Sequence, residues 1–317
     1  MVVTDGALHG TIGGGHLEFK ATEIARDLLT TRGTATLHRF PLGASLGQCC
    51  GGVAQLLFER VDGTTVWLDA LVSAHAGHIA CAIVTPLSGG TAEAPVVVTA
   101  QELTGTLGSA ERDAAAAALA RAMLAGKDAS RLVKIGPDAA GECFIDVVRQ
   151  PEMQVILFGA GHVGRALART LAGVPCRITW VDTRDDAFPV ERPRPVQCVT
   201  TDTPEVEVDA APPGAYFLVM THSHAMDEAL AERILARDDF AYFGLIGSAA
   251  KRRQFEKRLA ARGIDPARFE RMTCPIGVRG IAGKEPEVIA IAVAAELLQV
   301  DGTRAIAADA HRNARSA

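Results

Sequence analysis

The feature that most constrains the fold is a glycine-rich turn that follows a short apolar run. Gly159, Gly161 and Gly164 stand in the spacing G-x-G-x-x-G after the residues VILF, and helical periodicity follows them. Asp182 ends the next predicted strand, 18 positions after Gly164. This order is typical of dinucleotide-binding domains, where the helix start receives the pyrophosphate and the acid receives the ribose hydroxyls. We expect a Rossmann-type domain with a ligand site at this turn, which includes His162; the motif does not decide whether the ligand is NAD.

Strand and helix signals alternate from this turn to about residue 300. We expect an α/β fold in which residues 155–300 form a Rossmann-like parallel sheet with helices on both faces. The polar stretch 149–154, which contains Pro151, is predicted to link this domain to a smaller N-terminal domain of mixed α+β type over residues 1–148. The polar tail at 301–317 is expected to be frayed.

The N-terminal half consists of short segments bounded by turn residues. Helices are predicted over 16–33 and 109–126, because apolar residues or alanines recur there at helical spacing. Strands or mixed segments are predicted over 34–43, 53–61, 66–77 and 78–87, and strand pairs around turns over 1–10 and 131–148. We find no internal repeat along the chain.

Composition and charge exclude several classes of partner. The 317-residue chain has a formal net charge of −5, which gives no electrostatic reason to expect a nucleic acid or an anionic membrane. Its longest apolar runs fall short of the roughly 18 residues that span a bilayer, and no basic stretch precedes an apolar one near Met1. We therefore expect a cytoplasmic protein with reduced thiols, and the absence of a CxxC pair argues against structural zinc.

The sequence THSH places His222 and His224 directly after a predicted strand of the second half. Ligands of open α/β sheets gather at the carboxyl ends of strands, so both histidines and Asp227, which follows them, are expected in the crevice that the glycine turn also faces. They are candidates for ligand contact or, as a His-x-His pair, for metal binding. The alternative is that Thr221 or Ser223 caps the following helix and the histidines are polar loop residues.

A further candidate lies in the sequence GLIGSAAKRR, where Gly247 and Ser248 end a predicted strand and Lys251 opens a helix. A helix start with neighbouring cations suits a phosphate group. The alternative, which we weigh equally, is that Ser248 caps the helix and the basic residues form a solvated face.

Three consecutive glycines, Gly13, Gly14 and Gly15, form a second glycine-rich loop near the N-terminus. Their backbone N–H groups can approach a ligand closely because no side chain intervenes. Glu18 follows and adds negative charge at a helix start. A flexible strand-to-helix turn without a ligand is the alternative interpretation.

Two adjacent cysteines, Cys49 and Cys50, lie between Gln48 and Gly51 in the sequence LGQCCGG. Structural core cysteines would have large apolar neighbours, and a disulfide between adjacent residues would be strained. A reactive thiolate that binds a soft metal or carries sulfur suits this glycine-framed loop better. We therefore include these four residues in the candidate site, with the two thiols as its metal or sulfur end.

Together these motifs resemble the XdhC/CoxI family, the accessory proteins of xanthine dehydrogenase and related molybdenum hydroxylases. The resemblance rests on six segments in order along the chain: LHGTIGGGHLE, LGASLGQCCGG, VILFGAGHVGRALARTLAGVPCRITWVDTRDDAFP, MTHSHAMDEAL, GLIGSAAKRRQF and CPIGVRGIAGKEPEVIAIAVAAELL. It implies a chaperone, not an enzyme, that binds the molybdenum cofactor (molybdopterin). Such a protein protects the cofactor during sulfuration by a cysteine desulfurase and delivers it to the apo form of the hydroxylase.

The resemblance also implies roles for the candidate residues. Cys49 and Cys50 would contact or protect the molybdenum centre, and the turn from Gly159 to Gly164 would receive the phosphate or pterin. We expect the cofactor between the two domains, a common place for ligand sites. The alternative functions are an NAD(P)-dependent oxidoreductase that uses the Rossmann domain and a redox or metal sensor built on the cysteine pair.

Members of this family usually carry an additional segment ahead of the stretch that corresponds to MVVTDG. The chain is therefore expected either to have a start placed too late or to lack an element of its first sheet. In the second case an exposed strand edge would invite pairing with another chain. We expect a homodimer.

Overall fold

The protein is described by a computed structural model that covers residues 1–31, 36–42, 52–63, 65–77, 79–87, 94–126, 128–136, 141–149, 151, 153–193 and 196–315. The chain forms two compact units, Met1–Gln150 and Pro151–Ala317, and each is described by itself. Over these described residues, no helix is long and apolar enough to cross a membrane.

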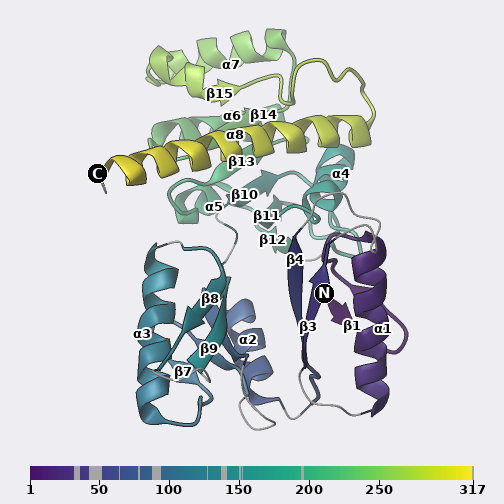
Figure 1. Ribbon diagram of the computed structural model, residues 1–317. Helices are drawn as coiled ribbons and strands as arrows, with labels where there is room; N and C mark the ends of the chain where they lie inside the picture. Colours follow the sequence, from purple (N-terminus) through teal and green to yellow (C-terminus); the bar gives the residue numbers. More distant parts are fainter. Residues whose placement is uncertain are drawn as a thin grey trace. The chain divides into compact units, whose positions relative to one another are not determined.

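The C-terminal unit is built on one sheet in which every neighbouring pair of strands is parallel. The strand order is β12-β11-β10-β13-β14-β15 (Figure 1). The strands are β10 (Met153–Phe158), β11 (Cys176–Asp182), β12 (Val196–Thr200), β13 (Tyr216–Val219), β14 (Tyr242–Leu245) and β15 (Met272–Thr273). The chain reverses direction across the sheet between β12 and β13. The carboxyl ends of β10 and β13 therefore form the topological switch point, where open α/β sheets bind ligands.

Helices cover both faces of this sheet. Alternate residues of each strand point to opposite faces, and because both sets are apolar, each face is buried by helices. Val155 and Leu157 of β10 belong to a buried cluster with α4 (His162–Leu171) and α8 (Pro286–Arg315). Ile156 and Phe158 belong to a second cluster with α5 (Glu205–Ala210), α6 (His224–Ala236) and α7 (Ala249–Ala261). A short 3-10 helix, Pro266–Arg271, precedes β15. The predicted α/β fold with a parallel sheet between two helical layers is confirmed.

The tail at 301–317 differs from the prediction, because α8 continues through it to Arg315. The hydroxyl of Tyr216 donates to Asp301 Oδ1 at 2.9 Å, and Arg304 donates to the carbonyl oxygen of Gly214 at 3.3 Å. These contacts hold the first turn of the tail against the sheet. The alanines and arginines that are frequent in this segment have high helix propensity, which sequence polarity alone does not reveal.

In the first half of the N-terminal unit, the described residues form two separate two-stranded antiparallel sheets and one helix. Its elements are β1 (Val2–Val3), β2 (Leu8–His9), α1 (Gly15–Thr31), β3 (Thr36–Pro41) and β4 (Val53–Phe58). β1 pairs with β2, and β3 pairs with β4. The predicted strand pair at 1–10 and the helix after it are confirmed.

The second half of this unit contains a five-stranded antiparallel sheet of order β7-β6-β5-β9-β8. Its elements are α2 (Val66–Ala76), β5 (Cys81–Pro86), β6 (Val96–Val98), β7 (Leu103–Thr104), α3 (Ala110–Gly126), β8 (Arg131–Lys134) and β9 (Glu142–Val148). The segment 66–77, predicted as strand or mixed, is helical. Trp67, Ala70 and Ala74 recur at spacings of three and four and pack on one side of the sheet, which is the period of a helix.

The two halves of the N-terminal unit repeat one pattern, so the prediction of no internal repeat is wrong. The residues ahead of the helix that recur 95 positions later are Val2, Val3, Thr4, Leu8, Gly10, Thr11 and Gly13. Helices α1 and α3 have 17 residues each and are offset by the same number of positions. Among the described residues, each half thus contains two short strands, a helix and two longer strands, and in the second half α2 and β5 precede them. The repeat is hard to see because its identical residues are scattered: seven precede the helix, and within the helix only Ala21, Ala25, Arg26 and Leu29 of α1 recur in α3.

Candidate functional site

The three glycines of the G-x-G-x-x-G turn have three different structural roles. Gly159 has a φ of 108°, and a Cβ there would collide with the carbonyl oxygen of Met220. A Cβ at Gly164 would collide with the carbonyl oxygen of Gly159, so this glycine lets α4 lie close to β10. A Cβ at Gly161 would meet nothing within 4 Å. Gly161 is therefore where a ligand can approach the backbone, as in dinucleotide-binding folds.

Helix α4 begins at this turn with its first N–H groups open. Gly161 is the N-cap residue, and no side chain caps the helix. Gly161 and His162 are exposed. Because the first N–H groups of a helix have no partner within the helix, they can bind an anion such as a phosphate. The start of α4 therefore fits the predicted phosphate position.

Asp182 was predicted to bind ribose hydroxyls, but its carboxylate accepts hydrogen bonds from other groups of the protein. Its Oδ2 accepts from the N–H of Ala160 at 2.7 Å and from Arg184 Nη2 at 3.0 Å, and its Oδ1 accepts from Arg184 Nε at 2.9 Å. Burial alone would raise the pKa of Asp182, but the hydrogen bonds from Arg184 and Ala160 outweigh it and lower the pKa. The carboxylate is 3% exposed. The structure thus places Asp182 beside the turn but gives it a partner other than a ribose.

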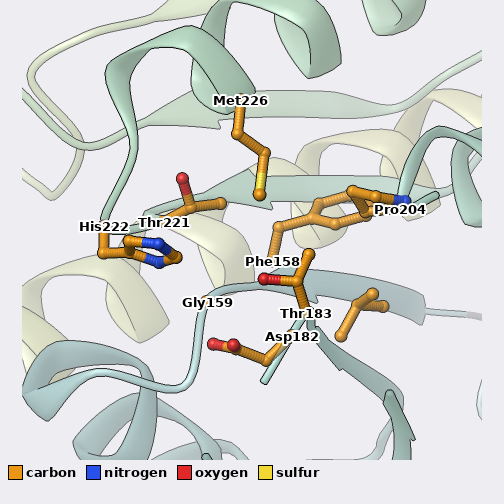
Figure 2. Close-up of a pocket in the computed structure, with 9 residues that line it drawn as sticks. Phe158, Gly159, Asp182, Thr183, Pro204, Thr221, His222 and Met226 are labelled. Carbon is orange, nitrogen blue, oxygen red and sulfur yellow. The ribbon is translucent and has the colours of Figure 1, made fainter. Parts of the chain in front are cut away.

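The pocket beside Asp182 is very small (Figure 2). It is lined by Phe158, Gly159, Val181, Asp182, Thr183, Pro204, Thr221, His222 and Met226. Figure 2 shows side chains from the ends of β10, β11 and β13 and from the start of α6 converging there. Its volume of about 10 Å³ has room for one water molecule and not for a purine ring. In this conformation neither Asp182 nor the pocket provides a site for the adenosine half of NAD.

The histidine loop after β13 lies at the switch point, as predicted, but it is arranged as a helix cap. Ser223 is the N-cap of α6 and accepts from the N–H of Met226 at 3.4 Å. His222 and His224 are exposed, and His222 lines the small pocket. In the part of the chain that the structure describes, no cluster of three or more His, Cys, Asp or Glu side chains could hold a metal ion. The capping interpretation therefore holds for Ser223, and metal binding by the histidine pair has no support.

Thr221 ties the same loop to the buried carboxylate of Asp227, which was expected to face the crevice but is held inside the protein. Its N–H and its hydroxyl donate to Asp227 Oδ1 at 3.0 and 2.7 Å. Asp227 is 1% exposed, and its Oδ2 accepts from Lys251 Nζ at 2.7 Å. Asp227 lies four residues after the cap Ser223, and its ion pair with Lys251 depends on the fold and not on a local motif.

Lys251, predicted to bind a phosphate, is instead enclosed in the fold. Besides its ion pair with Asp227, Nζ donates to the carbonyl oxygen of Ile246 at 2.9 Å, and the side chain is 13% exposed. Ser248 caps α7 by accepting from the N–H of Lys251 at 3.2 Å. A Cβ at Gly247 would lie 2.6 Å from Lys251 Cδ, so this glycine makes room for the lysine stem. The predicted cap is confirmed, but Lys251 is neither a free phosphate ligand nor part of a solvated face.

The triple-glycine loop before α1 is filled by a carboxylate of the protein. Glu18 Oε2 accepts from the N–H of Ile12 at 3.0 Å and of Gly14 at 3.1 Å, and also from the hydroxyl of Thr11. These hydrogen bonds, the one from Thr11 first, lower the pKa of Glu18. The structure supports the alternative interpretation of Gly13, Gly14 and Gly15, a turn into a helix, in which Glu18 takes the place of an external anion.

Gln48, Cys49, Cys50 and Gly51 lie outside the described residues, so their role stays a prediction. The described cysteines are free thiols, and most of them are buried. Burial raises the pKa of Cys176 to about 11, and Asp301 adds to the shift. These thiols act as small apolar side chains, not as nucleophiles.

The fold and site define a protein with a Rossmann-type domain whose glycine turn is open and whose acidic residue is engaged internally. Two family models match the chain: the XdhC Rossmann domain over residues 155–297 and the XdhC and CoxI family over residues 1–41. Together the matched segments cover more than half of the sequence and include both units. The chain belongs to the XdhC/CoxI family, as its motifs predicted.

Two similar proteins give context. The chain is 30% identical over 183 residues to an uncharacterized protein, YqeB, of Escherichia coli strain K12, which corresponds to 54% of this chain. It spans about a third of that relative, 32% of its length. A crystal structure described as a xanthine dehydrogenase (BH1974) from Bacillus halodurans superposes with a TM-score of 0.65 at 21% identity, over 95% of this chain and 84% of that one. The latter similarity supports the fold.

Proposed function

We propose that the protein is an accessory protein of xanthine dehydrogenase or a related molybdenum hydroxylase, and that it is not itself an enzyme. Its cargo is the molybdenum cofactor, which it protects during sulfuration by a cysteine desulfurase and delivers to the apo hydroxylase. Family membership of both units supports the accessory role. The observation that carries the binding proposal is the open start of α4 at Gly161, which suits the phosphate of this cofactor.

Each candidate residue has a defined task in this proposal. The N–H groups at Gly161 and His162 receive the phosphate, where charge and hydrogen bonding both favour an anion. Cys49 and Cys50 supply soft sulfur ligands beside the metal or its terminal sulfur. The bound cargo contributes a pterin, a phosphate and a dithiolene-held molybdenum, and the chain holds it without turnover.

The test is to purify the protein anaerobically from cells that make the cofactor, and to measure molybdenum by mass spectrometry and pterin by fluorescence after oxidation. The proposal predicts both at near-equal amounts to protein. Gly161→Ala should lower the retained pterin at least tenfold, because a Cβ there meets no protein atom and obstructs only a ligand. Gly173→Ala is the matched control, since its nearest neighbour lies 3.9 Å away, at the other end of α4.

A second pair of variants tests the metal end. Cys49→Ser with Cys50→Ser should release molybdenum, whereas Cys198→Ser, on the half-buried strand β12, should retain it. Retention of metal and pterin by the double variant would refute the cysteine assignment. Purification without molybdenum or pterin, combined with no activation of an apo hydroxylase, would refute the proposed function.

A further inference from the structure

Helix α8 has apolar side chains on two sides, and the C-terminal unit buries only one of them. Val293 and Leu297 are fully buried in the cluster that α8 forms with α4 and the sheet. On the other side, Ile291 is 55%, Leu298 45% and Ile306 73% exposed. Figure 1 shows α8 in yellow across the C-terminal unit. The packing of this unit therefore does not account for the outer side of the helix.

The exposed apolar residues follow the helix in one stripe. The stripe consists of Ile291, Ala295, Leu298, Gly302 and Ile306, which succeed one another at spacings of four, three, four and four. Residues three and four apart are neighbours on a helix surface, so these five positions lie in a row. We call this row the α8 stripe.

The outer side of α7, in the same unit, has a different composition. Over residues 253–258 of α7, two arginines, a glutamine and a lysine are exposed, which is usual for a helix at a protein surface. Over residues 291–306 of α8, Arg304 is the only exposed charged side chain among those that the structure describes. Depletion of charge distinguishes the centre of a protein interface from the rest of a surface.

Gly302 gives the stripe a point of close approach. A glycine within a helix is less favourable than an alanine, so it needs a packing reason. In the described chain, a Cβ at Gly302 would meet nothing within 4 Å, so no neighbouring element of the unit supplies that reason. The backbone of α8 is therefore open at this position to a second helix that comes near.

The α8 stripe is complementary to itself in the antiparallel direction. Two copies of α8 that cross about a two-fold axis between positions 298 and 299 bring Ile291 of one copy opposite Ile306 of the other. The same register brings Ala295 opposite Gly302. Large residues thus meet large ones and small residues meet small ones. An interface between identical subunits requires this property, because one surface has to fit itself.

The charges at the ends of α8 favour the same direction. Glu285 and Glu287 lie at its start, whereas Arg312 and Arg315 lie at its end. The two-fold register places helix position 312 of one copy opposite position 285 of the other, so the acidic start of each helix lies beside the basic end of its partner. The macrodipoles of two antiparallel helices also attract each other. A parallel pair would bring like charges together at both ends.

We propose that the α8 stripe is a contact surface for a second copy of this chain, with the two α8 helices antiparallel about a two-fold axis. A helix of 30 residues is about 45 Å long and offers a strip about 10 Å wide, so the pair covers on the order of 900 Å² in total. This area is below the roughly 1,200–2,000 Å² of stable complexes. The dimer therefore dissociates at about micromolar concentrations. The contact depends neither on a strand edge nor on the proposed cargo.

Cross-linking tests the register. Ile291→Cys and Ile306→Cys are prepared as separate full-length variants, mixed and oxidised with diamide, and the disulfide-linked peptides are quantified by mass spectrometry. The proposal predicts that the link between positions 291 and 306 exceeds the links 291–291 and 306–306 at least tenfold. Each variant oxidised alone is the control for links that the native cysteines form. Links 291–291 and 306–306 in excess would indicate a parallel pair and overturn the proposal, as would the absence of all three links.

Sedimentation velocity of the unmodified full chain, at concentrations up to about 200 µM, tests the occupant. Leu298→Glu should raise the dissociation constant of the dimer at least tenfold, because it places two carboxylates beside the two-fold axis. Val206→Glu is the matched control, since Val206 is 54% exposed on α5, away from the stripe. Gly302→Leu should also weaken the dimer, although leucine favours the helix itself. A parent chain that stays monomeric, or a dimer that Leu298→Glu leaves intact, would overturn the proposal.

Discussion

Helices α4 and α7 begin at the carboxyl edge of the same sheet, and their starts are built in opposite ways. The start of α4 has no side-chain cap and free space beside Gly161. The start of α7 is capped by Ser248, and the ammonium group of Lys251 beside it is held by Asp227. Both were phosphate candidates in the sequence. The difference shows that a helix start is available to an external anion only where its N–H groups and neighbouring charges have no partner inside the protein, and of these two starts that holds for α4.

The largest effect on stability is expected at the start of α7, where Lys251 and Asp227 form a buried ion pair. Lys251→Met should destabilise the protein by about 3–5 kcal/mol, because it leaves the carboxylate of Asp227 buried and uncompensated. The measurement is urea unfolding followed by circular dichroism. The double variant with Asp227→Asn should recover much of the loss, since both charges are then absent. A single variant within about 0.5 kcal/mol of the parent, the range usual for surface changes, would show that this pair does not hold the two loops together.

An intermediate effect, on ligand affinity, is expected at the uncapped start of α4. Pyrophosphate and NAD should bind there with affinities within about tenfold of each other, or about 1.4 kcal/mol, because the occupied Asp182 and the small pocket add nothing for adenosine. Calorimetric titration of both compounds gives the comparison. Arg184→Ala should shift the ratio toward NAD by freeing Asp182 for a ribose. Arg233→Ala, which removes an arginine from a similar pair with Asp209 at the surface, should not. NAD binding a hundredfold tighter than pyrophosphate in the parent would favour the oxidoreductase alternative.

The smallest effect on stability is expected from removing the N-cap of α7, Ser248. Ser248→Ala should cost about 1 kcal/mol, the usual value of a helix N-cap, since the N–H of Lys251 loses its acceptor. Thermal unfolding measures the loss. If the contrast between the two starts is correct, this variant should still bind no phosphate at α7, because Lys251 stays paired with Asp227. Phosphate stabilisation that appears in Ser248→Ala would show that the cap alone kept this start closed.

The sheet of the C-terminal unit could be predicted because the local signals agreed from the glycine turn to about residue 300, where the polar tail begins. The spacing of Gly159, Gly161 and Gly164 is fixed by two close backbone approaches and one open position. The motif therefore predicts the backbone geometry of the turn. The strand and helix signals after it alternate in the order of a parallel sheet. The helix α2 was missed because the apolar residues of a short segment fit two periods, and packing against the sheet decided between them.

The internal partners of the site could not be predicted in the same way. Lys251 and Asp227 are 24 residues apart, and their pairing depends on β13 and β14 being neighbours in the sheet. Asp182 and Arg184 are close in sequence, but nothing in the sequence shows that the arginine folds back onto the acid. A motif therefore predicts where a functional side chain lies, whereas the three-dimensional structure decides whether it is available to a ligand.

The two tryptophans fall one in each unit, and this distribution gives the molecule two independent optical probes. Trp180 is fully buried and donates from Nε1 to the carbonyl oxygen of Gly159 at 3.0 Å, directly beneath the glycine turn. Trp67 lies on α2 and packs against the sheet of the N-terminal unit. With Trp67→Phe, the remaining indole emission reports the unfolding of the C-terminal unit and any occupant of its turn. With Trp180→Phe, it reports the unfolding of the N-terminal unit alone, so the cooperativity between the units can be read directly from fluorescence.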